Sequence, residues 1–495
     1  MKFLICFLTV CCSLAATRPA DQGALLEKAI INIEITRRQY DHIQPWNRRV
    51  DQVSKIGTLI SPTEILTTAE YFSDQTLIRL QKQGRGRWFK GKLLWADYHA
   101  NLALVTCEED QFWDGLKPLS LAEKPPRSGT AQLARWRNGN MEARNVEINR
   151  YIVKQGKITF IDYLHLEVDS EINGTGWAEA IVQGNKLIGI TSSKEESSCT
   201  VLPSSFIRNV LEAHKQGDHK GLGYFAFVWQ RSENPATLDY FKLPGEPRGV
   251  MVIDVPHVPG ETNSLMPKDI ILEIDGFSID LQGDYNDPQF GNLLLENLAT
   301  RNKWAGDKVK LKVWRQGQMK EVGYTLPKAE YSNELVPSEV FDTAPEYAIL
   351  GGLVFQPLTV PFLRSWGADW LRKAPFRLAY STRQKKRPDE PSLIMLSLIL
   401  PDPINIGYQE SRYLLVESIN GRKVHTIGNV LQAIEHPRDG FHEILFKEGD
   451  SLRRMVLEAS ELPAATQRVL QRYGIQEPFM VKELPGLKTA QKGSN

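Results

Sequence analysis

The chain has 495 residues, of which 42% are hydrophobic and 24% charged, as is ordinary for a folded globular protein. This length exceeds what one hydrophobic core supports, so about three domains are expected. The net charge of +1 excludes a global field that would favour nucleic acid or an anionic membrane as partner.

The first sixteen residues have the pattern of an export signal. Lys2 gives a positive start, an apolar run extends from Phe3 to Val10, and Ser13-Leu14-Ala15 supplies the small residues that a signal peptidase reads. The run is too short to be a stable membrane anchor, and no later segment reaches about 20 apolar residues. Residues 1–16 are therefore predicted to be a cleaved signal peptide of a periplasmic or secreted protein.

Cleavage would leave two cysteines, Cys107 and Cys199. They could form a disulfide in an oxidising compartment or remain as buried thiols, and the sequence does not decide between these states. No spacing of cysteine and histidine is typical of a metal site. Neither a metal nor a cofactor is expected.

Short apolar and β-branched segments separated by turns fill residues 28–212. A first set runs from Ala29 to Cys107 and a second from Ala131 to Thr191, with a crossing rich in proline and glycine between them. Many short strands at this spacing are typical of β-barrels and sandwiches. We predict two barrels in tandem, followed by a helix with one apolar face. That face is formed by Phe206, Ile207, Val210 and Leu211.

A further module is predicted over residues 221–328, after a polar linker at Lys215–Lys220. Its clearest element is Pro267–Gly276, which contains a turn, a buried strand and a tight Asp-Gly turn. A helix is expected over Phe290–Thr300 and a strand over Lys308–Trp314.

The last module, residues 338–460, repeats this pattern. Tyr413–Gly421 is a strand that ends in Asn-Gly, and a helix is expected over Ile427–Ile434. Such a repeat within the sequence indicates two related domains, each containing helices and strands. Residues 461–495 are predicted to be a C-terminal tail with a short helical segment.

A basic cluster, Arg383–Arg387, lies inside the last module. It could be a nucleic-acid or targeting patch, but the oppositely charged Pro388–Pro391 follows at once. A solvated loop is therefore favoured, and no nucleic acid is expected as a partner.

The organisation as a whole resembles that of the HtrA/Deg-type serine proteases. Both C-terminal modules resemble PDZ domains in their strand, tight turn and following helix. Gly352–Phe355, Val360–Leu363 and Ile404–Tyr408 are similar to the second PDZ domain of the plant-type Deg proteases and their bacterial relatives. The resemblance implies a mainly β chain, with tandem six-stranded trypsin-like barrels followed by two PDZ-like α+β domains.

Three short motifs carry the chemistry in active members of this family. A serine attacks, a histidine takes its proton, and an aspartate orients the histidine. The histidine motif L-T-N-A-H matches Leu66–Glu70, and the aspartate before I-A-L-L matches the start of Asn101–Val105. The serine motif G-N-S-G-G-P matches Gly174–Glu179.

This match places Glu70, Asn101 and Gly176 in the histidine, aspartate and serine positions. The chain then has no nucleophile, no base and no orienting carboxylate. Trp177 and Ala178 also replace small glycines that shape the oxyanion hole. The sequence predicts a degenerate serine protease.

An active endopeptidase would need a different set of catalytic residues. The histidines and serines within the barrels are the available candidates, but their positions in the sequence do not show that they meet. They are His99, His165, Ser170, Ser192 and Ser193. An active protease with such an unrecognised site is one alternative, and a non-catalytic assembly subunit of an active Deg protease is another.

The predicted function is the binding of peptides, unfolded proteins or partner proteins through the PDZ-like domains. PDZ domains add a peptide strand to a sheet edge and hold its terminal carboxylate on backbone N–H groups. Phe225, Ala226 and Phe227 occupy this carboxylate loop, where alanine replaces the usual glycine and weakens the case for carboxylate capture. Because family members commonly trimerise through the protease domain, the resemblance also leaves room for a homo-oligomer.

Overall fold

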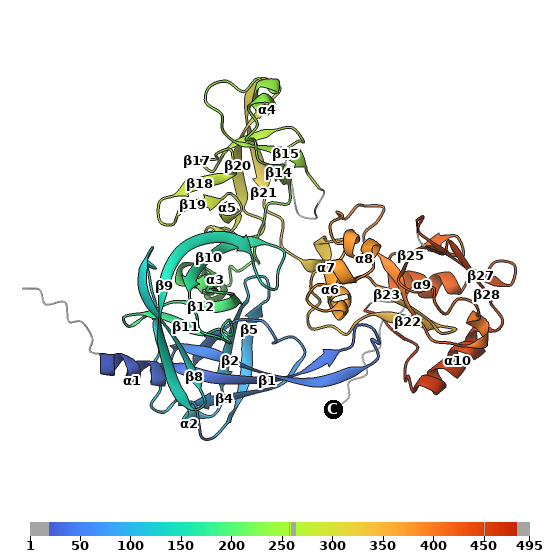
Figure 1. Cartoon of the computed structure of the whole chain (residues 1–495), viewed down its shortest axis with the longest axis horizontal. Coiled ribbons are helices and arrows are strands. Elements are labelled where there is room, and N and C mark those ends of the chain that lie inside the picture. The colour runs from blue at the N-terminus through green and yellow to red at the C-terminus, as the bar shows by residue number, and fades with distance from the viewer. Residues whose placement is uncertain (1–18, 257, 259–263, 450, 483–495) are drawn as a thin grey trace, which may run out of the picture.

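The computed structural model describes residues 19–256, 258, 264–449 and 451–482, which form a mostly β-structure (Figure 1). The signal peptide predicted for residues 1–16 lies outside this range. None of the helices in the described ranges combines the length and the apolarity that crossing a membrane requires.

Six strands close the first barrel in the order β1-β2-β3-β6-β5-β4. They are β1 (Ile30–Tyr40), β2 (Arg48–Ser61), β3 (Glu64–Thr67), β4 (Gln75–Lys82), β5 (Phe89–Asp97) and β6 (Leu102–Cys107), preceded by α1 (Pro19–Ala29) and followed by α2 (Asp110–Trp113). The alternation along β1 puts Ile31, Ile33 and Ile35 into the core of the barrel, where all three are fully buried.

The second barrel is built in the same way. Its sheet has the order β11-β8-β9-β10-β13-β12-β7, and an additional pairing of β11 with β12 closes a ring of six strands. The strands are β7 (Ser120–Leu121), β8 (Gly129–Arg137), β9 (Asn140–Gln155), β10 (Asp162–Asp169), β11 (Ala180–Gln183), β12 (Lys186–Glu195) and β13 (Ser198–Pro203), and α3 (Ser204–Gln216) follows. The predicted tandem barrels are confirmed. Cys107 and Cys199 lie in different barrels as buried free thiols.

The third module contains the sheet β14-β15-β16-β20-β21, with β17 beside β16. Its elements are β14 (Val228–Gln230), α4 (Pro235–Tyr240), β15 (Val250–Asp254), β16 (Ile270–Ile274), β17 (Phe277–Ser278), β20 (Lys308–Arg315) and β21 (Gln318–Thr325). The predicted strand within Pro267–Gly276 is β16. Its tight turn has positive φ at Asp275 and Gly276, as an Asp-Gly hairpin turn requires.

The helix expected over Phe290–Thr300 is wrong for most of its length. The segment forms the hairpin β18 (Asp284–Asp287) and β19 (Gly291–Leu294), and only one turn of helix, α5 (Asn297–Thr300), remains. Asp287 decides this, because its carboxylate accepts hydrogen bonds from the N–H groups of Gln289 and Phe290, at 2.8 and 3.1 Å, and so fixes a turn. The hairpin packs on the second barrel, and the cores of barrel and module merge.

The last module is built on the sheet β28-β27-β25-β24-β23-β22-β29, with β26 beside β25. Its strands are β22 (Tyr347–Leu350), β23 (Leu353–Pro357), β24 (Ile394–Ile399), β25 (Leu414–Ile419), β26 (Arg422–Lys423), β27 (Phe441–Phe446), β28 (Arg454–Glu458) and β29 (Phe479–Met480). Its helices are α6 (Val360–Leu363), α7 (Trp370–Lys373), α8 (Phe376–Ser381), α9 (Ile427–Ile434) and α10 (Leu462–Tyr473), and 3-10 turns form at Tyr331–Asn333, Arg364–Trp366 and Pro403–Asn405.

This module extends past residue 460, where a tail was expected. Strand β29 pairs with β22, and α10 packs on the same strand, with Thr466 accepting a hydrogen bond from the N–H of Gly351 at 2.9 Å. Residues 461–482 therefore complete the fold of the last module.

Two connections hold the last module against the first barrel. The long β1–β2 hairpin reaches toward β22, where Trp46 packs edge-on against Tyr347 at 5.9 Å (Figure 1). The segment between the third and last modules lies along the first barrel, where Phe341 stacks on Tyr98 at 4.1 Å and Tyr331 stacks on His99 at 4.2 Å.

Candidate functional site between the barrels

Glu70 and Asn101 meet in the first barrel. The N–H of Glu70 donates a hydrogen bond to Oδ1 of Asn101 at 3.1 Å, so the two residues are neighbours as a catalytic base and its orienting partner would be. The Glu70 carboxylate, however, forms an ion pair with Lys157 from the β9–β10 loop at 2.8 Å. The side chain in the base position is therefore neutralised by a lysine of the second barrel.

Asn101 is fully buried and has a left-handed backbone with φ of 52°. Asparagine tolerates this conformation better than most residues do. Its Nδ2 has no hydrogen-bond partner among the described residues. An amide carries no charge, so this residue offers no electrostatic stabilisation to a cationic base.

Gly176 occupies a position that strongly favours glycine. Its φ is 97°, which side chains rarely adopt, and a Cβ placed there would lie 3.0 to 3.1 Å from backbone atoms of Ser193 and Lys194. A serine at this position would have a strained backbone and tight contacts with the backbone of β12, which would have to shift by a few tenths of an ångström. The turn as it stands is therefore shaped for glycine.

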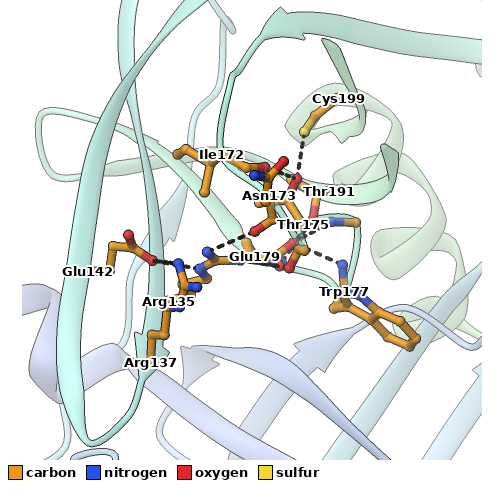
Figure 2. A network of polar contacts seen from close by, with 12 residues as sticks. Arg135, Arg137, Glu142, Ile172, Asn173, Thr175, Trp177, Glu179, Thr191 and Cys199 are labelled. Carbon is orange, nitrogen blue, oxygen red and sulfur yellow. Dashed lines mark hydrogen bonds and ion pairs between the residues drawn. The ribbon is translucent and has the colours of Figure 1, made fainter. Parts of the chain in front are cut away.

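The turn also carries its own anion. The N–H groups of Gly176 and Trp177 both donate to Oε2 of Glu179 at 2.9 Å, and the hydroxyl of Thr191 donates to the same oxygen (Figure 2). Glu179 is almost completely buried. The N–H of Gly176, which would be one of the two donors to a developing oxyanion, is thus used inside the turn.

Arg135 on β8 fixes the other side of this network. Its guanidinium donates to the carbonyl oxygens of Gly174 and Asn173 at 2.7 and 3.1 Å and to Glu142 at 2.8 Å, and it lies 3.8 Å from Oε1 of Glu179 (Figure 2). The buried carboxylate is therefore paired and hydrogen-bonded, as a buried charge must be. Sequence reasoning missed the roles of Arg135 and Glu179. The sequence feature that could have revealed them is Arg135 itself, a charged residue within the apolar strand segment Ala131–Trp136.

Trp177 joins the two barrels across the site. Its ring stacks on Tyr71 at 5.6 Å, Lys157 lies over its face at 5.7 Å, and its carbonyl oxygen accepts from the N–H of Ile56 at 2.9 Å. Burial and the nearby charge of Glu70 raise the pKa of Tyr71 to about 12. An aromatic pair therefore occupies the space beside the triad positions.

Lys55 on β2 is a second buried group that the sequence did not reveal. Its Nζ donates to the carbonyl oxygen and hydroxyl of Thr68 at 2.7 and 2.6 Å and to the carbonyl oxygen of Glu70 at 2.8 Å. Burial lowers the pKa of Lys55 to about 7, against the opposing effect of the Glu70 charge. The amine ties down the loop that carries the base position.

The stability of the protein is expected to rise with pH through Lys55. An unfolded lysine titrates at about 10.4, so between roughly pH 7 and 10 the unfolded chain binds a proton that the folded chain lacks. Unfolding then takes up a proton, and raising the pH disfavours it by at most about 1.4 kcal/mol per pH unit. Urea unfolding of the wild type and Lys55→Met across this window measures the effect. The difference between the two free energies should increase with pH, and a constant difference would contradict it.

The two barrel histidines do not form an alternative triad with any of the described residues. His99 contacts the hydroxyl of Thr159 at 2.8 Å, and His165 contacts the carbonyl oxygen of Tyr163 at 2.9 Å. Burial lowers their pKa values, to about 4 for His99 and about 3 for His165. Within the described ranges, neither imidazole is hydrogen-bonded to a serine, and no group of histidine, cysteine and carboxylate side chains is placed to hold a metal.

The carboxylate loop of the third module is largely internal. The N–H of Ala226 donates to the hydroxyl of Tyr324 at 2.9 Å, and Phe227 is buried against the same ring. Phe225 is half-buried and packs on both aromatic neighbours. The N–H that would hold a peptide carboxylate therefore already has an acceptor.

The two modules differ in the strand that follows this loop. In the third module β14 is the outermost strand, and among the described residues only β15 pairs with it. In the last module β23, which follows Gly351-Gly352, is paired on both sides, by β22 and by β24. Among the described residues, the strand that follows this loop thus has an unpaired edge in the third module, whereas in the last module both edges are paired.

Comparisons with known proteins agree with this architecture. A family model described as PDZ domain matches residues 336–479. The "Putative protease Do-like 3, mitochondrial" of Arabidopsis thaliana is 25% identical over 86% of this chain and 77% of its own length. The "Protease Do-like 2, chloroplastic" of the same plant is 24% identical over 90% of this chain and 74% of its own length.

Among solved structures, the "HtrA-type protease AlgW with decapeptide" is 17% identical in sequence, with a TM-score of 0.47. The match covers 63% of this chain and 98% of the AlgW chain. The PDZ match lies on the last module, and the two relatives are similar to this chain over most of its length. The chain is a homologue of the HtrA/Deg-type proteases and carries a PDZ domain.

Proposed function

We propose that this homologue is a pseudoprotease that binds extended peptide segments or partner proteins. The observation that carries the non-catalytic part is the Gly176 turn. It has no serine, its positive φ and tight contacts oppose any larger side chain, and its N–H groups are bonded to its own Glu179. Serine protease chemistry needs the opposite arrangement in each respect.

The binding part of the proposal rests on β14. A peptide can add a strand to an unpaired sheet edge through main-chain hydrogen bonds, without using its terminus. Trp229 on β14 donates from Nε1 to Glu296 at the start of α5 at 2.8 Å, which fixes the strand against the neighbouring helix turn. The edge is therefore held in place for an incoming strand.

Absence of protease activity is tested first. The purified chain is expected neither to cleave unfolded casein nor to react with a fluorophosphonate probe, because the Gly176 turn has no attacking group. An active HtrA-type protease is the positive control. Probe labelling mapped by mass spectrometry to any serine in residues 28–212 would refute the proposal.

Peptide binding is expected to be indifferent to the peptide's C-terminus, because Ala226 N–H is already bonded to Tyr324. Ten-residue peptides that bind in an array screen would be remade with free and amidated ends and titrated by fluorescence anisotropy. Affinities of each pair should agree within about twofold. A preference for the free carboxylate of about tenfold or more would show carboxylate capture instead.

We also propose that residues 1–16 are removed on export. Mass spectrometry of the native protein is expected to find an N-terminus close to Thr17. A dominant form that begins at Met1 and stays in the cytosol would contradict this.

A further inference from the structure

The outer side of α7 and α8 exposes large apolar side chains. Leu371, Phe376 and Tyr380 are 54%, 80% and 50% exposed, and the rings of Phe376 and Tyr380 stack at 5.7 Å. We call these three residues the α7–α8 face. In Figure 1 the two helices lie at the end of the last module away from β27 and β28.

These exposed side chains are not needed to build the hydrophobic core of the last module. Other residues of this region already supply the local core, in which Leu363 of α6, Ala374 directly after α7 and Leu378 of α8 are buried. Single exposed apolar residues are common, but neighbouring ones on one surface mark a contact site. The α7–α8 face is therefore available for a partner.

The charge around this face points to the kind of partner. Residues 364–387 contain eight lysines and arginines and one acidic residue, in a chain whose net charge is +1. Arg372, Arg383 and Lys385 are exposed, and no ion pair joins them to any residue in the described ranges. The basic cluster that the sequence analysis interpreted as a solvated loop thus borders an apolar surface.

We infer that the α7–α8 face docks on an anionic lipid surface. Aromatic and aliphatic side chains that project from a surface enter the headgroup region, while flanking cations are attracted to lipid phosphates. Phe376 at 80% exposure projects outward, whereas peptide recognition by apolar side chains uses grooves. The contact is peripheral and uses a local cluster of cations, so it does not depend on the net charge of the chain, which is +1.

Co-sedimentation of the full-length chain with vesicles tests the inference. The vesicles are phosphatidylcholine alone, or phosphatidylcholine with about 30% phosphatidylglycerol, at low and high salt. Binding to the anionic vesicles is expected to be about tenfold or more stronger than binding to the neutral ones, to which only the N-terminal apolar segment contributes. Raising the salt from about 0.05 to 0.5 M should weaken binding by about tenfold or more, because it screens the exposed cations.

Two double variants separate the apolar and the basic contributions. Phe376→Ala with Tyr380→Ala should bind about tenfold or more weakly. Arg372→Gln with Arg383→Gln should lose most of the preference for anionic vesicles. Tyr240→Ala is the matched control, since Tyr240 is also 80% exposed but lies on α4.

The control variant should bind like the wild type. All variants keep the same N-terminal apolar segment, so its contribution to vesicle binding cancels, and circular dichroism checks that each is folded. The inference is overturned if the wild type binds no vesicles, or if Tyr240→Ala weakens binding as much as the change at Phe376 and Tyr380. It is equally overturned if those two residues prove to mediate self-association, seen by light scattering, without vesicle binding.

Discussion

Restoring all three triad side chains, by Glu70→His, Asn101→Asp and Gly176→Ser together, is expected to give no measurable proteolysis. The serine would have a φ near 97° and a Cβ within 3.1 Å of backbone atoms of β12, so the turn must shift to admit it. The new nucleophile would then not be held where attack occurs. A misplacement of about 1 Å costs on the order of 10²-fold in rate.

The loss of one oxyanion donor adds to this effect. Glu179 would still accept the N–H group at position 176, which would otherwise face the oxyanion. Losing one donor of an oxyanion hole costs about 10²–10³-fold. Taken with the misplaced nucleophile, activity should lie roughly 10⁴-fold or more below that of an active homologue.

A graded series of variants measured by casein cleavage tests this reasoning. Adding Trp177→Gly and Ala178→Gly to the triple variant relaxes the turn but leaves Glu179 in it. Activity well above that of the triple variant is therefore expected only when Glu179→Ala is added as well. A triple variant as active as a working homologue would show that the turn was intact and that this account of it is wrong.

Glu179→Ala alone is expected to lower the free energy of unfolding by about 3–5 kcal/mol. The change leaves two buried N–H groups and the hydroxyl of Thr191 without their acceptor, and leaves Arg135 with one carboxylate, Glu142, instead of two. Unsatisfied buried donors each cost about 1–3 kcal/mol.

Urea unfolding followed by tryptophan fluorescence measures this loss. Glu179→Gln keeps an acceptor oxygen of the same shape, so it should cost less than alanine. Glu195→Ala, which removes an exposed ion pair with Lys154 on the same barrel, is the control and should cost at most about 1 kcal/mol. Equal effects at positions 179 and 195 would mean that the buried network contributes little.

The sequence predicted the barrels because their information is local. The alternation of apolar and polar residues along each strand, and the turn residues between strands, can be recognised within a few consecutive residues. The proposed triad positions were also assigned from short windows, since each motif spans a few residues. In the structure Glu70 and Asn101 do lie side by side, as that match implies.

The Glu179 network was not predictable in this way. Its partners, Arg135 and Thr191, lie on other strands, and only the closed barrel brings them to the turn. The helix expected over residues 290–300 failed for a different reason. Its apolar spacing suits a helix or a hairpin, and the turn fixed by Asp287 selected the hairpin.

The pairing of β22 beside β23 has a consequence for competition between ligands. A peptide adds to a PDZ sheet only at an open edge, and β22 already holds the edge beside β23, with β29 on its far side. Because β22 is joined to β23 by the short Gly351-Gly352 turn, it acts as a tethered competitor at an effective concentration on the order of millimolar or higher. A free peptide at micromolar concentration would have to displace β22 from the edge of β23. The last module thus holds one of its own strands where a PDZ ligand would add, and under the proposed function external peptides would bind at the third module.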